Sequence, residues 1–563
     1  MTNYNYRNIT FRSTDLNHIP EDMDASYEIL LPYEDKIREW IGESDKNRLN
    51  FVNEPITVLN QFMEKRDMEK LVQTLKTVKL PLDVSKFLTS FSVPVLKSGV
   101  PTDPIISPSI DYTEGWDEVA SVTVEDLNYM ISRLLEKVEY IPYVYKANDY
   151  EISMNMGQFL VTGGNGVSIY TTFPVLAGSY SDTDGSQVDL SGAEVVIELR
   201  LDKVEVDPNI QDKDKESKEY KYYLSFADSD LIKSVHIYLP DDVSKPLLMG
   251  YAEVDMGRRI PTIMAKFARV FPIYSVTVKA GASNNNSYLL PTHCEFCCAN
   301  TTKVEESCFS TLIKTVNQEG EWETSLDSIP KMSKMALIIS NKIFMDQIMV
   351  KTLVKSFSQY NADISENNFI TKNNSTCIEM ESNTKIELPI DNCPDINLSA
   401  LTIAIDQNEE FVIQTHLSTT LAHFYNIEGT YYSRFKLKIE NAVMDGKNVQ
   451  KITLVEQGEP IVDLDCDWGW AAYLMLALMI PGGILGAITA AILASIQLVI
   501  TKMLNNFDVD DYLDVNELLD GKLVWEFTNI ADLVEVHPLA CLQIGFSTIK
   551  KQVDPLNIED LNL

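Results

Sequence analysis

The chain is poor in cysteine, with eight in 563 residues. Small disulfide-stabilised domains carry a much denser set, so we expect no disulfide framework. One cluster, His293, Cys294, Cys297 and Cys298, approaches the spacing of a zinc site, but a second pair of ligands is missing nearby. Free thiols in or beside a strand are therefore the favoured interpretation, and we predict no bound metal.

Common sequence signatures of catalysis are also missing. There is no Walker loop, no dinucleotide-binding glycine fingerprint, no HExxH metal motif and no GxSxG nucleophile turn. The six histidines are scattered, and the acidic triplet Asp463, Asp465 and Asp467 lacks the glycine and the terminal glutamate of a calcium-binding EF-hand. The sequence therefore predicts no catalytic residues, no cofactor and no enzyme activity.

Positive charge is scarce. Lysine and arginine number 47 against 82 aspartates and glutamates, which gives a formal net charge of -35. Such an acidic surface repels phosphate backbones, so we expect no nucleic-acid partner. The N-terminus lacks a basic segment followed by an apolar one, so we predict no secretory signal peptide. Synthesis should leave the protein in the cytoplasm, with any release to the medium by an unconventional route.

The patterns that are present divide the chain into three predicted domains. Residues 1–110 carry helix-like apolar spacing with few strand signals, and their role is left open. Four prolines between Pro94 and Pro108 then predict a linker. Residues 111–330 and 331–563 follow as two further domains, each combining strand patterns with an amphipathic stretch.

An amphipathic helix is predicted over residues 124–138. Thr123 precedes it, and Asp126 stands three residues later, as in a capping box with aspartate in place of glutamate. Apolar residues then recur at helical spacing and form one stripe: Val124, Leu127, Met130, Ile131, Leu134, Leu135 and Val138.

Downstream, the period of the apolar pattern changes from helical to two. Val195, Ile197, Leu199 and Leu201 fall on one face of a predicted strand, with charged residues between them. Long alternating strands of this kind favour an antiparallel sheet with one buried and one wet face. The GGNG sequence at residues 163–166 predicts a tight turn.

A second helical block is predicted from Met335 onward, where the chain reads KMALIISNKIFMDQIMVKTLVKSF. Its apolar face is rich in methionine, a side chain that adapts to irregular partners. Packing as core is the favoured interpretation, and a ligand-facing stripe stays open beside it. The face consists of Met335, Ile338, Ile339, Met345, Ile348, Met349 and Leu353.

No charged residue occurs between Trp468 and Thr501. The run is long enough to span a bilayer, but Pro481-Gly482-Gly483 interrupts it and leaves two shorter halves. In the second half, small residues repeat every four positions beside an isoleucine ridge of Ile484, Ile488, Ile492 and Ile496. Three interpretations stay open: burial against the sheets, a membrane-inserting hairpin over residues 468–500, and an interface with a partner protein.

Two motifs carry a resemblance to a known family. The stretch EGWDEVASVTVEDLNYMI around Gly115, Trp116 and Asp117, and the run MALIISN at residues 335–341, resemble the clostridial forty-seven-kilodalton and OrfX proteins of botulinum-type toxin gene clusters. The late uncharged run fits the same pattern. The resemblance covers residues from about 111 to the end of the sequence, and it leaves out the N-terminal region.

That family belongs to the TULIP superfamily of tubular lipid-binding proteins. The resemblance therefore implies an α+β fold in which strongly curved antiparallel sheets wrap around long amphipathic helices. With it we expect a mainly helical N-terminal region.

The resemblance also implies a non-enzymatic lipid-binding accessory protein of a toxin gene cluster. Its partners would be a lipid or other hydrophobic ligand, held between sheet and helix in a hydrophobic tunnel, and other proteins of the cluster. A pore-forming or membrane-inserting component and an assembly scaffold are the alternatives. The expected ligand-lining residues are Leu127, Met130, Ile131, Leu134, Ile484, Ile488, Ile492 and Ile496.

Overall fold

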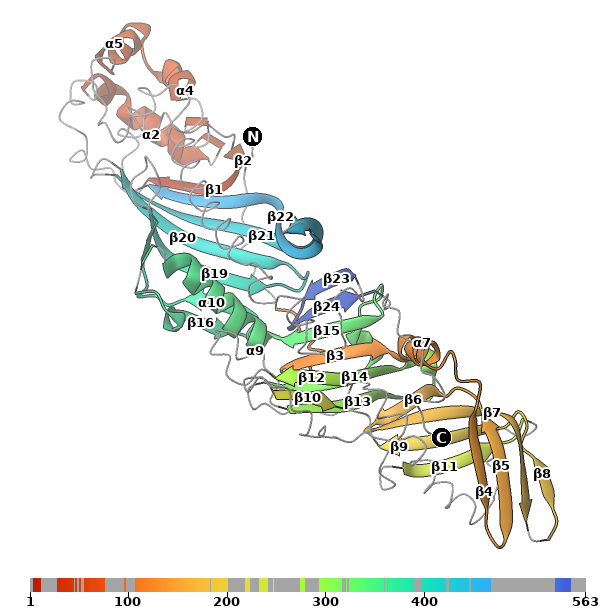
Figure 1. Ribbon diagram of the computed structural model, residues 1–563. Helices are drawn as coiled ribbons and strands as arrows, with labels where there is room; N and C mark the ends of the chain where they lie inside the picture. The colour runs from red at the N-terminus through yellow and green to blue at the C-terminus, as the bar shows by residue number, and fades with distance from the viewer. Residues whose placement is uncertain are drawn as a thin grey trace. The chain divides into compact units, whose positions relative to one another are not determined.

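In this computed structural model the chain forms two units (Figure 1). One unit contains residues 1–108, 348–437 and 454–507, and the other contains residues 109–347, 438–453 and 508–563. The sequence predicted three consecutive domains instead. The units are discontinuous in sequence, because the chain leaves each of them and later re-enters it. Apart from short gaps, the structure describes residues 4–11, 28–75, 96–97, 107–200, 218–222, 232–240, 274–278, 293–388, 396–466 and 532–547.

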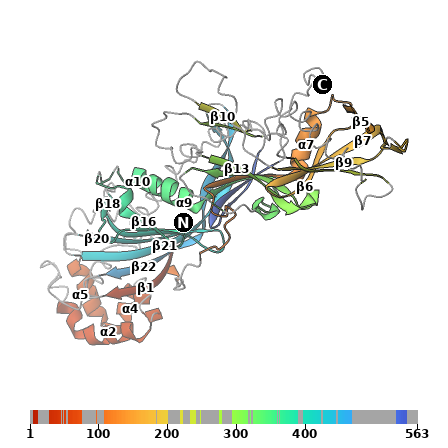
Figure 2. The same ribbon diagram turned by 90° about the horizontal axis from the view of Figure 1, so that it is seen from below.

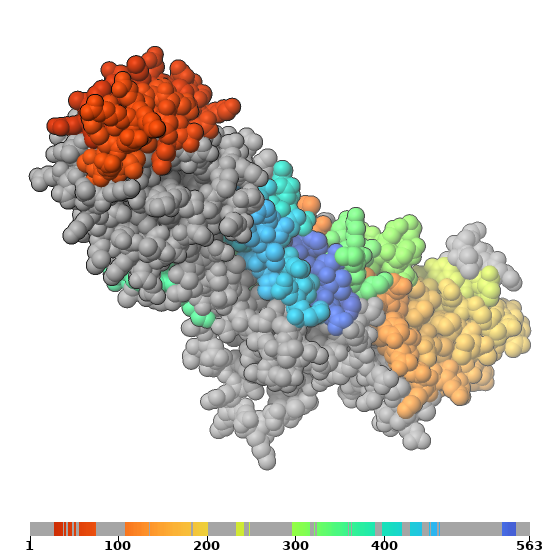
Figure 3. All heavy atoms as spheres, turned by 90° about the horizontal axis from the view of Figure 1, so that it is seen from above, coloured from red at the N-terminus to blue at the C-terminus, as the bar shows by residue number. Residues whose placement is uncertain are grey.

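The N-terminal part of the first unit contains a small group of helices. These are α2 (Glu34–Glu43), α4 (Pro55–Phe62) and α5 (Lys65–Leu75), preceded by the 3-10 turn η3 (Leu31–Tyr33). Their apolar sides meet around Ile37, Leu59 and Leu71, which are fully buried, and the Trp40 ring contacts Phe62 edge-on. Figure 3 shows them as one cluster of atoms. The described part of residues 1–110 also contains two strands, β1 (Tyr4–Phe11) and β2 (Leu96–Lys97). The prediction of a mainly helical region did not include them.

A sheet that lies mostly in the first unit has nine strands among the described residues, in the order β16-β17-β19-β20-β21-β22-β1-β2, with β18 paired to β19. Helix α10 (Val350–Ser358) packs beside it, where the Phe357 ring stacks on Phe369 at 6.3 Å between centroids. Besides β1 and β2, the sheet consists of β16 (Phe369–Lys372), β17 (Cys377–Met380), β18 (Ile386–Leu388), β19 (Ile396–Ile405), β20 (Phe411–Leu421), β21 (Tyr425–Met444) and β22 (Lys447–Cys466).

The second unit contains a thirteen-stranded sheet within the described ranges. Its main path runs β11-β9-β7-β6-β13-β14-β3-β15-β24-β23, with every described pairing antiparallel. A separate pair joins β10 (Lys218–Tyr222) to β12 (Tyr274–Val278). The large sheet consists of β3 (Glu118–Thr123), β4 (Ile141–Lys146), β5 (Tyr150–Met156), β6 (Leu160–Gly166), β7 (Ser168–Asp182), β8 (Gln187–Asp189), β9 (Glu194–Arg200), β11 (Ile232–Tyr238), β13 (His293–Thr301), β14 (Cys308–Lys314), β15 (Met335–Ser340), β23 (Leu533–Pro538) and β24 (Cys541–Phe546).

The middle strands of this sheet are buried on both faces. On one face, Trp116, Val119, Leu312 and Ile338 belong to one apolar core. A buried chain of hydroxyl groups crosses that core: Ser121 Oγ lies 2.7 Å from Ser310 Oγ and 3.2 Å from Ser328 Oγ, and Ser310 Oγ lies 2.7 Å from Thr324 Oγ1. Because each hydroxyl finds a partner, the desolvation cost of burying it is offset.

The predicted amphipathic helix forms, but it is shorter than expected. Helix α7 (Val124–Leu134) starts where predicted, and the Thr123 hydroxyl accepts a hydrogen bond from the Asp126 backbone N–H at 3.2 Å. The predicted end at Val138 is wrong, because Leu135 leaves the helical conformation. The described residues therefore do not confirm the long helices of the expected fold.

The second helical block is partly wrong. Met335 to Ser340 forms β15, paired with β3 on one side and β24 on the other, and all six residues are buried. A short apolar run buried on both faces has no period that separates strand from helix. The helix starts only at Asn341, where the Ser340 side chain accepts from the Ile343 N–H, and it continues through a π-helical turn (Phe344–Met349) into α10.

Two predictions about the strands can be compared with the structure. The alternation in β9 is confirmed, since Val195, Ile197 and Leu199 are buried while Glu194 and Arg200 are exposed, and Leu201 lies outside the described residues. The tight turn predicted at residues 163–166 is confirmed with a shift of about two residues, because β6 pairs antiparallel with β7 as far as Gly164 and Ile169, and the chain reverses between them. Gly166 in this turn has a φ of 75°, which glycine adopts without strain. Gly164 is needed for close approach, since a Cβ there would lie 2.5 Å from the Cys298 Cβ.

Candidate hydrophobic-ligand site

Helix α7 is attached to the sheet by side-chain amides. It packs against β3, β6 and β14. The Asn128 amide makes two hydrogen bonds of 2.7 Å to Val161 of β6: it donates to the carbonyl oxygen and accepts from the backbone N–H. The Gln158 amide donates to the Leu135 carbonyl at 2.8 Å, next to the end of the helix. These bonds satisfy backbone groups that would otherwise be buried without partners, and they fix which face of α7 meets the sheet.

The structure brings three of the predicted ligand-lining residues to that face. Leu127 and Ile131 are only 4% and 5% exposed, and Met130 is half-buried at the border of the stripe. The opposite side of the helix is wet, as Tyr129 is 50% exposed. The side chain of Leu134 lies outside the described set. The described part of the predicted stripe is therefore an apolar surface packed against the sheet.

The other half of the predicted site is not described. Ile484, Ile488, Ile492 and Ile496 lie outside the described residues, as does the whole uncharged run 468–501. Its burial, its insertion into membranes and its use as an interface all stay predictions. In the part of the chain that the structure describes, no helix has both the length and the apolar character needed to cross a membrane.

The GWD motif connects three strands at their ends. The Asp117 carboxylate accepts hydrogen bonds from the Thr315 backbone N–H at 2.8 Å and from its hydroxyl at 3.1 Å. The Ser340 N–H donates to the Asp117 carbonyl at 2.8 Å, so the ends of β14 and β15 meet the start of β3. Trp116 is buried in the core beside them. The motif thus holds the ends of these three strands together.

Sequence reasoning missed a buried acid directly after the motif. Glu118 is 1% exposed, and its register partners are Ile313 of β14 and Ile339 of β15. One carboxyl oxygen, Oε1, is buried and has no hydrogen-bond partner. Burial raises the pKa of this carboxyl to about 8, and the neighbouring charge of Asp117 adds to the rise. The only available signal was an acid next to the apolar VASV sequence, which a surface strand would share.

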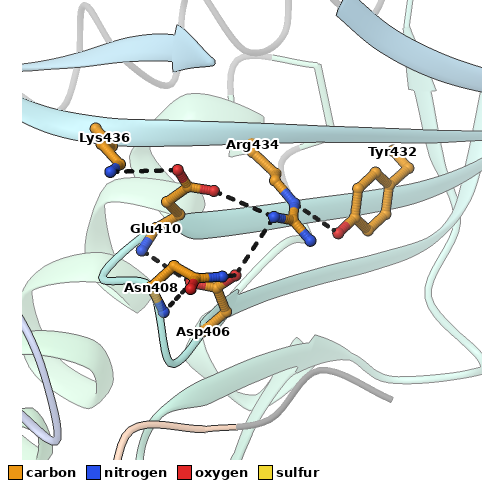
Figure 4. Close-up of polar contacts among 6 residues, drawn as sticks. All are labelled: Asp406, Asn408, Glu410, Tyr432, Arg434 and Lys436. Atoms are coloured by element: carbon orange, nitrogen blue, oxygen red, sulfur yellow. Dashed lines mark hydrogen bonds and ion pairs between the residues drawn. The ribbon is translucent and has the colours of Figure 1, made fainter. Parts of the chain in front are cut away.

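A second cluster of charges lies in the first unit, where Figure 4 shows Arg434 of β21 reaching the β19–β20 turn. Its Nη1 is 3.4 Å from Glu410 Oε2 and 3.8 Å from Asp406 Oδ2, and Lys436 Nζ is 3.4 Å from Glu410 Oε1. Asp406 also accepts from the Asn408 and Glu410 backbone N–H groups. The acids are thus engaged in holding the turn against β21.

Five cysteines of the described residues are free thiols in strands. Cys297 and Cys298 are in β13, Cys308 is in β14 and Cys541 is in β24, all buried. Burial raises the pKa of Cys298 and Cys308, and raises that of Cys541 to about 12, so thiolate formation is disfavoured. Within the described ranges, no group of three or more metal-ligating side chains lies together.

The fold defined by these elements is that of a mostly antiparallel β protein with few helices, in which amphipathic helices pack on large sheets. The chain belongs to the OrfX-like family: a family model described as Protein OrfX2/OrfX3/P47 matches residues 113–520. The resemblance inferred from the GWD and MALIISN stretches is confirmed.

Solved structures agree with this assignment. P47 from Clostridium botulinum A2 matches with a TM-score of 0.53 and 18% identity, covering 77% of this chain and 98% of that one. P47 of Clostridium botulinum E1 matches with a TM-score of 0.51 and 15% identity, over 77% and 99% of the two chains. A lipopolysaccharide binding protein matches with a TM-score of only 0.25, which carries no argument. A search of curated proteins found no match.

Proposed function

We propose that this protein is a non-enzymatic, TULIP-type binder of lipids or other hydrophobic molecules, serving as an accessory protein of a bacterial toxin gene cluster. Family membership supports the accessory role, and two solved structures that share the fold are of P47 from Clostridium botulinum. Other proteins of such a cluster are the proposed protein partners.

The observation that supports ligand binding is the apolar face of α7 enclosed against the sheet. Leu127 and Ile131 form its buried centre, and half-buried Met130 forms its border. Methionine is unbranched and adapts its shape to what it touches, so an acyl chain that entered at this border would meet a side chain able to repack around it. Each methylene removed from water contributes about 0.8 kcal/mol, so even a partly inserted chain would bind usefully.

Lipid extraction and ligand uptake test the proposal. The purified full chain is analysed by native mass spectrometry and by organic extraction, and it is then titrated with a fluorescent fatty acid. We expect a co-purified lipid and saturable uptake. Absence of both would overturn the lipid-binding function and leave an assembly scaffold.

A pair of variants on the same helix locates the site. Met130→Trp should obstruct the border and weaken uptake about tenfold, which corresponds to 1.4 kcal/mol. Tyr129→Trp places the same bulk on the exposed side and should leave uptake unchanged, because Tyr129 points to solvent. Equal loss in both variants, or loss in neither, would show that the ligand binds elsewhere.

A further inference from the structure

The N-terminal strand pairs with the sheet of the first unit in an unusual direction. β1 runs parallel to β22, in a sheet whose other described pairings, apart from β1 with β2, are antiparallel. The register joins Asn5 to Ile461, Tyr6 to Val462 and then Ile9, Thr10 and Phe11 to residues 464–466, with an irregularity between Tyr6 and Ile9. Parallel pairing is slightly less stable per residue than antiparallel pairing, and the irregularity weakens it further.

Strand β1 also lies outside the part of the chain that defines the family. The family model matches residues 113–520, which include β22 but not β1. Along the strand order, β1 follows β22 at the end of the path, with only the two-residue β2 beyond it. Figures 1 and 2 both show β1 between β22 and the N-terminal helices. Without β1, β22 would present a free edge, which is a ready template for another strand.

We propose that the β22 edge is a strand-docking site that β1 covers within one chain and that accepts β1 from a second copy of this protein. When a chain's own β1 is displaced, the vacant edge takes the β1 of its neighbour, and reciprocal exchange joins two copies. The added strand supplies main-chain hydrogen bonds, as in other cases of strand addition.

Charge favours β1 as the occupant over a second β22 edge. Residues 1–13 contain Arg7 and Arg12 and no acid, although the whole chain has a net charge of -35. The paired stretch of β22, Ile461 to Cys466, contains Asp463 and Asp465 and no basic residue. Two β22 edges would bring aspartates together, which is destabilising between neighbouring strands. An N-terminal strand of positive charge fits this edge.

A peptide of residues 1–13 tests the docking site. A chain lacking residues 1–13 should bind the fluorescent peptide, and the intact chain should bind it about tenfold more weakly because its own β1 competes.

In a parallel ladder, alternate N–H groups face a given neighbour. Of two peptides carrying Ile9→Pro or Thr10→Pro, one therefore loses a bond to β22 and the other does not, so one should bind about tenfold more weakly than the other. No binding, or equal binding by both proline peptides, would overturn the docking site.

Light scattering tests the second copy as the partner. The shortened chain mixed with intact chain should form a heterodimer, which excess wild-type peptide should dissolve. Failure to form it, or self-association of the shortened chain that the peptide does not reverse, would overturn β1 exchange between copies. If the shortened chain fails to fold, the intact chain carrying the more disruptive of the two prolines replaces it as acceptor, with the same expected and contrary results.

Discussion

Among single residues, Glu118 gives the fold a pH dependence whose sign follows from its surroundings. Its pKa is raised to about 8 in the folded chain by burial and by the charge of Asp117. Between the ordinary carboxyl pKa and about 8, the folded state holds a proton that the unfolded state has lost. The contribution of Glu118 to the free energy of unfolding is therefore largest below the ordinary carboxyl pKa, and it is lost as pH rises toward 8.

Glu118→Gln should remove that dependence. We expect the variant and the wild type to melt at similar temperatures at pH 5, where the carboxyl is protonated. The variant should become the more stable by an amount on the order of a few kcal/mol at pH 9, where a buried unpaired carboxylate is costly. Thermal unfolding of both proteins from pH 5 to pH 9 measures the difference.

Glu125→Gln is the matched control for this comparison. Glu125 is an exposed acid on α7 whose pKa is lowered by its hydrogen bond and ion pair with Lys334. It stays ionised in both states above pH 5, so its effect should not vary over the range. A constant Glu118→Gln effect across the same range would show that the acid is charged or solvated in the native chain.

Replacing Gly164 with alanine should destabilise the fold. A Cβ there would lie 2.5 Å from Cys298 Sγ and 2.7 Å from the Ser168 carbonyl oxygen, so Gly164→Ala must displace a strand. We expect a loss of about 1–3 kcal/mol in urea unfolding. Adding Cys298→Ala removes one of the clashing groups, and the double variant should lose less than the sum of the single losses. If the stability losses of the two single variants simply add in the double variant, the strain caused by Gly164→Ala does not come from the Cys298 thiol.

At the scale of elements, the attachment of α7 depends on Asn128. Asn128→Ala would leave the N–H and the carbonyl of Val161 without their partner, and Val161 is buried. We expect a loss of about 1–3 kcal/mol. Ser132→Ala serves as control, because the Ser132 hydroxyl bonds only to the Tyr129 carbonyl at an exposed site on the same helix. Equal urea midpoints for the two variants would contradict the role of the amide.

Local patterns predicted the elements that depend on neighbours along the chain. The Thr123 cap and the α7 stripe come from interactions within a few residues, and the alternation in β9 needs only one buried face. The strand Met335–Ser340 could not be told from a helix, because β3 and β24 bury both of its faces. Likewise, the burial of Glu118 depends on Ile313 and Ile339, about two hundred positions away. Strand pairings between residues so far apart in the sequence produce no local periodic pattern from which burial could be predicted.

At the scale of the whole molecule, the sheet of the second unit is completed by the late strands β23 and β24. The family model ends at residue 520, yet β24 lies between β15 and β23, and all six of its residues are buried. Further along, the Gln450 amide bonds to both backbone groups of Leu533, at 2.8 and 3.2 Å, and so holds β23. Residues after 530 thus complete a sheet that begins at β3.

A chain ending at residue 530 should therefore lose the second unit selectively. Removing β24 uncovers β15 and several core side chains, each contributing about 1.5–3 kcal/mol, against a usual total stability of about 5–15 kcal/mol. Hydrogen exchange followed by mass spectrometry should show lost protection in β3, β14 and β15. Protection in β19 and β20 of the first unit should persist, because those strands pair with each other and with β17 and β21. If β15 stayed protected in the shortened chain, β24 would be an accessory strand, and the sheet would be stable within the limits of the family match.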